Sequence, residues 1–245
     1  MVQSIQKTKE EVLECLQEGE ITLQGQFVLG YNYTFLVEVG GSCDPFKAVY
    51  KPDNGQQPIW DFPLYRLSRR EVAAYLVSDA LGWDLVPPTV LRKSSLLGAG
   101  SIQLYVDHDP NQHYFTFSDD IRANLQATVV FDILINNADR KGGHILLDPS
   151  NRIWLIDHGL CFHEEDKLRT VIWDFAGESI PTDLLEDLKH FLQELGELGP
   201  VVESLSSLIL DSELSALRSR CGRLIHNPYF PYPPSDRRYI PYPPV

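Results

Sequence analysis

Three side chains that could bind a metal or move a proton lie close together in the middle of the chain. Asp139 and His144 precede a pair of short apolar segments within 145–156, and Asp157 follows them. The segments read as two strands joined by a turn at 148–151, whose Asp, Pro, Ser and Asn residues favour tight turns. Because a hairpin returns its second strand to the level where the first began, the three side chains can converge on one point.

Two carboxylates and an imidazole at one point suit phosphoryl transfer. In that reaction one carboxylate orients or deprotonates the acceptor hydroxyl, and two further groups hold the metal ion that bridges the phosphates. His144 lies five positions after Asp139 (144 − 139), and Asp157 lies eighteen after it (157 − 139). Asp139 is therefore the candidate catalytic residue, and His144 and Asp157 are the candidate metal ligands.

Earlier elements carry two more charged side chains. The segment 46–52 alternates as a strand with Lys47 and Lys51 on one face, and a helix with an apolar face begins near Ser68. Glu71 lies in the first turn of this helix, where Ser68-x-x-Glu71 also forms a capping box. A solvated strand-end lysine and a purely capping glutamate are the structural alternatives for this pair.

One further helix is predicted to lead into the catalytic stretch. It begins at Ser118, an N-cap followed by two acidic residues, and ends at Asn136. Apolar residues recur every four positions along it and predict one buried face: Ile121, Leu125, Val129 and Ile133.

The catalytic stretch resembles a known family. Asn136-x-x-Asp139-Arg140 leading into the hairpin, with Ile156-Asp157-x-Gly159 after it, is similar to the catalytic and metal-binding loops of the phosphatidylinositol 3-/4-kinase superfamily. The resemblance is closest to its type II 4-kinase branch and to small bacterial kinase-like proteins. It is clearest over 129–160 and weaker from 23 to 181. The sequence departs from the family at His144, where Asn is usual, and at His158, where Phe is frequent.

The resemblance implies an α+β fold with two lobes, as in protein kinases and phosphatidylinositol kinases. A small β-rich N-lobe is expected over 21–107, after an N-terminal helix in 1–20. A mostly helical C-lobe is expected over 108–226. The Pro/Tyr-rich segment 227–245, called the tail below, is predicted to be extended, and either disordered or laid along a surface.

The resemblance also assigns roles in ATP binding. It implies that Lys51 pairs with the α- and β-phosphates and that Glu71 holds this lysine in place; Lys47 is the competitor if the register shifts. The strand that precedes the second lobe would line the adenine site through Leu104, Tyr105 and Val106. A hairpin turning at Gly30 could cover the phosphates, although its glycines match no phosphate-loop motif and an ordinary hairpin is the alternative.

The metal expected with ATP depends on residue 144. The amide oxygen of the usual Asn is a hard ligand that suits Mg²⁺, whereas the imidazole nitrogen of His144 is softer and suits Mn²⁺ or Zn²⁺ better. We therefore predict Mg²⁺ or Mn²⁺ as the metal that accompanies ATP.

Composition excludes several classes of partner. The 245 residues carry a formal charge of −13, so general binding to nucleic acid or to anionic membranes is not expected. The segment from Asp157 to 180 contains six acidic and two basic residues, a net charge of −4 (2 − 6 = −4). This negative charge disfavours a polyphosphorylated lipid as acceptor. The four cysteines lack paired spacing and no leader-like apolar run opens the chain, so free thiols in the cytoplasm are expected.

The sequence therefore predicts an ATP-dependent phosphotransferase that acts on a protein or small-molecule hydroxyl, with a lipid less favoured. A nucleotide-binding pseudokinase is the main alternative, because His144 replaces the usual Asn. Transfer of AMP on the same fold is a second alternative, and a metal-dependent hydrolase built on His144, Asp157 and His158 is a third. The tail could also bind a Pro-recognising partner.

Overall fold

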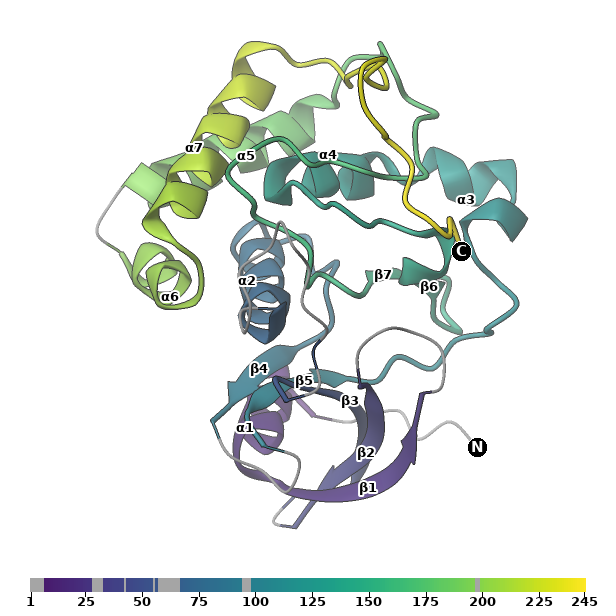
Figure 1. The fold of residues 1–245 in the computed structure, drawn as a ribbon, viewed down its shortest axis with the longest axis vertical. Coiled ribbons are helices and arrows are strands. Elements are labelled where there is room, and N and C mark those ends of the chain that lie inside the picture. The colour runs from purple at the N-terminus through teal and green to yellow at the C-terminus, as the bar shows by residue number, and fades with distance from the viewer. Residues whose placement is uncertain are drawn as a thin grey trace.

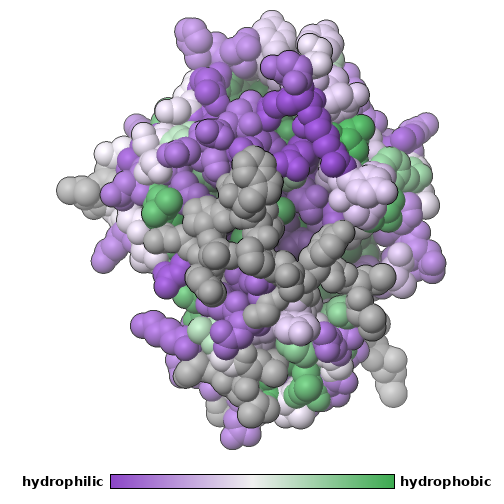
Figure 2. Space-filling model, in the orientation of Figure 1, coloured by the Kyte–Doolittle hydropathy of each residue, from purple (hydrophilic) through white to green (hydrophobic). Residues whose placement is uncertain are grey.

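The chain folds into a sheet lobe and a helical lobe, which confirms the predicted two-lobed α+β architecture (Figure 1). The computed structural model describes residues 7–27, 33–41, 43–54, 56, 67–93, 98–196 and 199–245. The predicted turn at Gly30 lies outside the described residues. Figure 2 shows a mostly hydrophilic face with scattered hydrophobic residues.

The sheet lobe is built on five antiparallel strands in the order β1-β2-β3-β5-β4. One face packs on α1, and the buried core between them includes Leu16, Val37, Ala48 and Ile102. Burial alternates along β3, so Tyr50 points into this core and Lys51 points away from it. The elements are α1 (Lys9–Glu18), β1 (Glu20–Gln26), β2 (Phe35–Gly40), β3 (Phe46–Pro52), β4 (Thr89–Arg92) and β5 (Gly100–Leu104).

Helix α2 (Leu67–Ala80) joins the two lobes. It contacts β4 and β5 on one side and α6 on the other, so most of its residues are buried. Ser68 lies inside the helix and donates its hydroxyl hydrogen to Asp53 at 2.5 Å, so it is not the N-cap. The capping alternative for Glu71 is therefore wrong.

The helical lobe packs around α4 and α7, with the short hairpin β6–β7 at its edge nearest the sheet lobe (Figure 1). The predicted single helix after Ser118 is wrong in one respect, because Asn124 ends a first helix and bonds back to the carbonyl of Asp120. The elements are η1 (Tyr114–Thr116), α3 (Asp119–Ala123), α4 (Gln126–Ile135), η2 (Gly142–His144), β6 (Ile145–Leu147), β7 (Ile153–Leu155), α5 (Thr182–Gly196), α6 (Pro200–Leu208) and α7 (Asp211–His226).

The tail lies along the helical lobe, which decides between the two alternatives expected from its composition. In Figure 1 it descends in yellow from the far end of this lobe and ends beside β6 and α3. Ile180 donates its N–H to the carbonyl of Pro228 at 2.8 Å, and the Phe230 ring packs 5.4 Å from that of Phe175. Phe230 of the tail thus contributes to the lobe's core.

The expectation of four free thiols is wrong for two of them. Cys15 and Cys43 form a disulfide, with their Cα atoms 6.3 Å apart. The fold brings the last turns of α1 beside the turn after β2, a proximity that the spacing of the cysteines along the chain does not show. Cys161 and Cys221 are free and buried. None of the described helices is long and apolar enough to cross a membrane.

Candidate functional site

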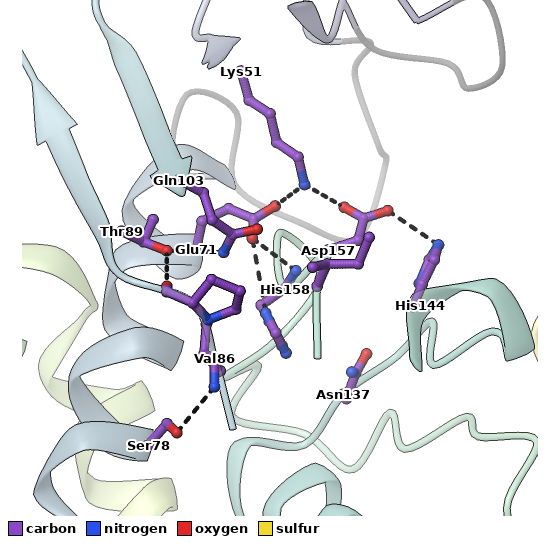
Figure 3. A network of polar contacts seen from close by, with 12 residues as sticks. Lys51, Glu71, Ser78, Val86, Thr89, Gln103, Asn137, His144, Asp157 and His158 are labelled. Carbon is purple, nitrogen blue, oxygen red and sulfur yellow. Dashed lines mark hydrogen bonds and ion pairs between the residues drawn. The ribbon is translucent and has the colours of Figure 1, made fainter. Parts of the chain in front are cut away.

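Lys51 and Glu71 form an ion pair at the junction of the lobes. Strand β3 presents the Lys51 ammonium group toward α2, where Glu71 Oε1 lies 2.5 Å away (Figure 3). Burial alone would lower the pKa of Lys51, but Asp157 and Glu71 outweigh it and raise the pKa above its usual range. Lys51 is therefore a fixed positive charge. The competitor Lys47 is exposed and lies 5.8 Å from the ring of Tyr105.

Asp157 completes this ion pair from the other lobe. Its Oδ1 lies 2.9 Å from Lys51 Nζ, so Lys51 joins α2 to the loop after β7. The backbone of Asp157 has φ 62°, a left-handed conformation that turns the side chain back toward the hairpin. Burial would raise the pKa of Asp157, but Lys51 and His144 lower it far below its usual range. The side chain is 47% exposed, so the charged carboxylate is open to a ligand.

His144 faces Asp157 with an unprotonated nitrogen. Its Nδ1 lies 3.1 Å from the carbonyl oxygen of Asp139, which can only accept, so Nδ1 carries the hydrogen. Its Nε2 lies 3.3 Å from Asp157 Oδ2. Burial lowers the pKa of His144 to about 4, so the ring is neutral at pH 7. Two lone pairs directed at one place fit a cation, which would hold them together.

Asp139 is placed by the loop that connects α4 to the hairpin. Asn136 ends α4 in the left-handed conformation, and Asn137 then accepts the backbone N–H of Asp139 at 2.9 Å. The carboxylate of Asp139 lies 3.4 Å from Lys141 Nζ. Burial raises the pKa of Asp139 to about 6, although Lys141 acts in the opposite direction. A carboxylate with this pKa can accept a proton near neutral pH.

Arg140 holds the catalytic stretch together, a role that the motif containing it did not reveal. Its guanidinium group forms an ion pair with Asp132 of α4, at 2.9 Å, and both side chains are 0% exposed. It also donates to the carbonyl oxygens of His144 at 3.1 Å and of Ile156 at 3.0 Å. One buried side chain therefore fixes both ends of the hairpin. An Arg beside the candidate catalytic residue Asp139 and an Asp in an apolar helix were the available signals.

His158 connects Arg140 to Glu71. Its Nε2 accepts a hydrogen bond from Arg140 at 2.9 Å, so its Nδ1 carries the hydrogen and points toward Glu71 Oε2, 3.9 Å away. The backbone N–H of His158 donates to the same Glu71 oxygen at 2.9 Å. Burial lowers the pKa of His158 well below its usual value. The backbone of His158 thus holds Glu71, while its neutral ring accepts from Arg140.

The strand predicted to line the adenine site has part of its backbone already bonded. The N–H of Leu104 donates to the carbonyl of Pro88 at 2.9 Å, and the N–H of Tyr105 donates to that of Lys47 at 3.1 Å. The carbonyl of Val106 accepts from the His108 ring at 2.8 Å. These three residues are not part of the charged network around Lys51.

Comparison with known proteins identifies the family to which the chain belongs. The sequence profile described as "Phosphatidylinositol 3- and 4-kinase" matches residues 66–232, which include Glu71, Asp139, His144 and Asp157. The chain belongs to the phosphatidylinositol 3- and 4-kinase family. Protein Rv2133c of Mycobacterium tuberculosis is 38% identical to this family member over 93% of both chains. Phosphatidylinositol 4-kinase gamma 4 of rice is 33% identical over 42% of this chain and 22% of its own length.

Solved structures establish the fold of this phosphatidylinositol 3- and 4-kinase family member. The Golgi casein kinase, in a crystal structure with Mn/ADP bound, superposes with a TM-score of 0.56 at 14% identity. The match covers 89% of this chain and 74% of that one. At this identity the likeness concerns the fold alone, and it confirms the predicted two-lobed kinase-like architecture.

The structure brings together most of the side chains singled out in the sequence of this family member. Lys51, Glu71, Asp157 and His144 form one continuous polar network across the two lobes (Figure 3). Asp139 joins this network through its backbone carbonyl at His144. Lys141, beside Asp139, is a further residue that sequence reasoning missed.

Proposed function

We propose that this protein is an ATP-dependent phosphotransferase. The observation that carries the proposal is the meeting of His144 Nε2 with Asp157 Oδ2 at one end of a network whose other end is the Lys51–Glu71 ion pair. A metal site beside a fixed ammonium group is what a nucleotide polyphosphate needs. Family membership and the kinase-like fold support a phosphotransferase in the same sense.

Each residue would have one task in this reaction. Asp139, with its raised pKa, orients the acceptor hydroxyl and takes up its proton. Lys51 neutralises charge on the α- and β-phosphates while Glu71 holds it in place. Lys141, 3.4 Å from the Asp139 carboxylate, can follow the negative charge that develops on the transferred group.

His144 and Asp157 would hold the divalent metal. Among the described residues, no group of three or more His, Cys, Asp or Glu side chains is placed to bind a metal ion. The remaining ligands would then come from phosphate oxygens and water, as is usual for Mg²⁺ and Mn²⁺ with ATP. Once bound, such an ion would neutralise charge on the phosphates. The structural neighbour with Mn/ADP bound supports this choice of cofactors.

The adenine ring would lie against the chain at Leu104, Tyr105 and Val106. Because the first two N–H groups are engaged in the sheet, backbone recognition would use the carbonyl of Tyr105 and the N–H of Val106. This assignment separates the adenine contacts from the charged groups that bind the phosphates.

The acceptor would be a hydroxyl on a protein or a small molecule. The segment from Asp157 to 180 carries a net charge of −4 and borders the catalytic loop through the pairing of Arg140 with Thr170. Negative charge at this place opposes a polyphosphorylated lipid head group. The same charge opposes nucleic acid and stable membrane association.

A nucleotide-binding pseudokinase is the second candidate, favoured by the imidazole of His144 in place of the usual amide. ADP release with Mg²⁺, Mn²⁺ or chelator separates the two functions in wild type and Asp139→Asn. The enzyme predicts metal-dependent release that Asp139→Asn abolishes. Absence of release with every metal contradicts it. Release of pyrophosphate in place of ADP would instead identify transfer of AMP.

The compartment that suits this activity is the cytoplasm, because ATP is supplied there. A disulfide is uncommon in a reducing compartment, so the Cys15–Cys43 bond would then be transient. Pro241 is buried, so a Pro-recognising partner would reach this proline only after the tail leaves the helical lobe. Alkylation of free thiols in intact cells, followed by mass spectrometry, measures the fraction of Cys15 and Cys43 that is in the disulfide. A small fraction is expected if the bond is transient.

A further inference from the structure

The tail is fastened to the loop that carries the proposed catalytic residue. The backbone N–H of Gly142 donates to the carbonyl of Pro244 at 2.7 Å, and Gly142 follows Asp139 by only three positions. A side chain added at Gly142 would meet the ring of Phe115 at 3.0 Å and the carbonyl oxygen of Pro244 at 3.5 Å, so the ring and the end of the tail both pack closely on this glycine. The last residues of the tail therefore lie beside the catalytic loop.

A second set of contacts holds the tail next to the segment that pairs with Arg140 of the same loop. The N–H of Thr170 donates to the carbonyl of Tyr239 at 3.0 Å, and Thr170 itself pairs with Arg140. Arg237 donates a hydrogen bond to the carbonyl oxygen of Asp166 at 2.5 Å and forms an ion pair with the Asp166 carboxylate at 2.9 Å. The tail is thus held on both sides of Tyr242.

Tyr242 is the exposed hydroxyl between these anchors. Its ring is 78% exposed, and the Arg238 guanidinium lies 5.4 Å from the ring centre. Two residues span at most about 7 Å, so the anchor at Pro244 keeps Tyr242 within reach of the catalytic loop. An exposed ring changes rotamer within nanoseconds, so its hydroxyl can turn while the backbone stays anchored.

We propose that Tyr242 is an acceptor for phosphoryl transfer within the same chain. The inference rests on the proposed function and names a substrate for it. The bond from the γ-phosphorus of ATP to the bridging oxygen breaks, and ADP leaves. A new bond forms between that phosphorus and Tyr242 Oη, and the hydroxyl proton passes to the Asp139 carboxylate.

The product would be held by charge. Phosphotyrosine carries nearly two negative charges at neutral pH and pairs well with guanidinium groups. The Arg238 guanidinium already lies over the Tyr242 ring, and Arg237 is the residue before Arg238 in the sequence. The tail thus offers two positive charges near Tyr242, although the whole chain carries a net charge of −13. Modification would therefore strengthen the local contacts of the tail.

The test uses the full chain, treated with phosphatase and then incubated with ATP and Mn²⁺. ADP release is measured in parallel with peptide mass spectrometry. We expect one phosphate on Tyr242 in wild type and none in Asp139→Asn. Tyr242→Phe removes the acceptor, and Tyr232→Phe is its matched control, because Tyr232 is 74% exposed in the same tail but lies beside Gly177. Tyr232→Phe should leave the phosphate on Tyr242.

Transfer within one chain has its own kinetic signature. The fraction modified per unit time should not change on tenfold dilution of the protein. Arg237→Ala removes one anchor of the tail and lowers the effective concentration of the Tyr242 hydroxyl near the site, so modification should slow about tenfold. The rate of ATP hydrolysis, in which water is the acceptor, should not change. A rate that rises in proportion to protein concentration would overturn transfer within the chain.

The outcomes separate this inference from the proposed function. ADP release without phosphate on Tyr242 overturns the inference and leaves the phosphotransferase standing. Absence of both ADP release and modification overturns the proposed function as well. AMP on Tyr242 overturns the phosphoryl-transfer step itself.

Discussion

His144 Nε2 and Asp157 Oδ2 lie 3.3 Å apart, and neither atom carries a proton at neutral pH. The hydrogen of the imidazole is committed to the carbonyl of Asp139, on the opposite side of the ring. Two acceptors held this close repel each other unless a cation lies near both of them. The relationship favours the proposed metal site over an ordinary hairpin end, and under that proposal residue 144 is the position that should select the metal.

His144→Asn should change the metal preference. The substitution replaces a soft nitrogen with the hard oxygen that is usual in this family, so the ratio of turnover with Mg²⁺ to turnover with Mn²⁺ should rise by about tenfold. ADP release at saturating concentrations of each metal measures this ratio. His190→Asn, on the exposed face of α5, is the matched control and should leave the ratio unchanged. An unchanged ratio in His144→Asn would show that residue 144 does not bind the metal.

Glu71→Gln should weaken ATP binding without disrupting the fold. The amide oxygen can still accept the N–H of His158, but the charge opposite Lys51 is lost. We expect the Kd for ATP with Mn²⁺ to rise about tenfold, equivalent to about 1.4 kcal/mol. Titration calorimetry measures it, and Glu186→Gln, at an exposed pair with Lys189, serves as the control. Equal affinities for ATP in the two variants would show that Glu71 does not hold Lys51 for phosphate binding.

The pH dependence of turnover should report on Asp139. Its pKa is raised from 3.8 to about 6 by burial, and the charged form is the one that accepts a proton. Turnover should therefore be constant well above pH 6 and fall about tenfold for each pH unit below it. Lys141 lowers this pKa, so Lys141→Met should move the acid limb to higher pH, whereas Lys189→Met should not. If the acid limb of the Lys141→Met profile stays at the pH of wild type, a group other than Asp139 controls the loss of turnover.

Asp132→Asn should destabilise the whole protein. The substitution leaves Arg140 buried without a charged partner, which costs about 3–5 kcal/mol in the free energy of unfolding. Urea denaturation followed by circular dichroism measures the loss. Asp119→Asn breaks an ion pair at the surface and should leave the midpoint unchanged. Equal midpoints for the two variants would contradict the role assigned to Arg140.

Sequence reasoning succeeded where the signal was local. The alternation of 46–52 placed Lys51 on the face opposite Tyr50, and the turn residues at 148–151 marked the hairpin. The resemblance at Asn136-x-x-Asp139-Arg140 then led to the family and to the two-lobed fold, and both are confirmed. Side-chain periodicity and turn chemistry are properties of neighbours in sequence, so they need no knowledge of the fold.

Contacts between distant segments could not be read in the same way. Asp132 interrupts an apolar helix, and only the folded loop reveals that Arg140 neutralises it. The Cys15–Cys43 bond depends on how α1 packs beside the turn after β2. The break at Asn124 depends on a side chain that bonds back to the preceding turn while Leu125 stays buried in the core. Each depends on packing that composition and spacing do not encode.

Calorimetric titration of ATP into wild type and Asp157→Ala, with Mn²⁺ and with chelator, tests the central claim most directly. The phosphotransferase site predicts binding to wild type that requires the metal. It also predicts that Asp157→Ala loses the metal-dependent part, while the circular dichroism spectrum is unchanged. Binding of equal affinity in both proteins, or in the presence of chelator, would show that His144 and Asp157 do not form the metal site of a nucleotide.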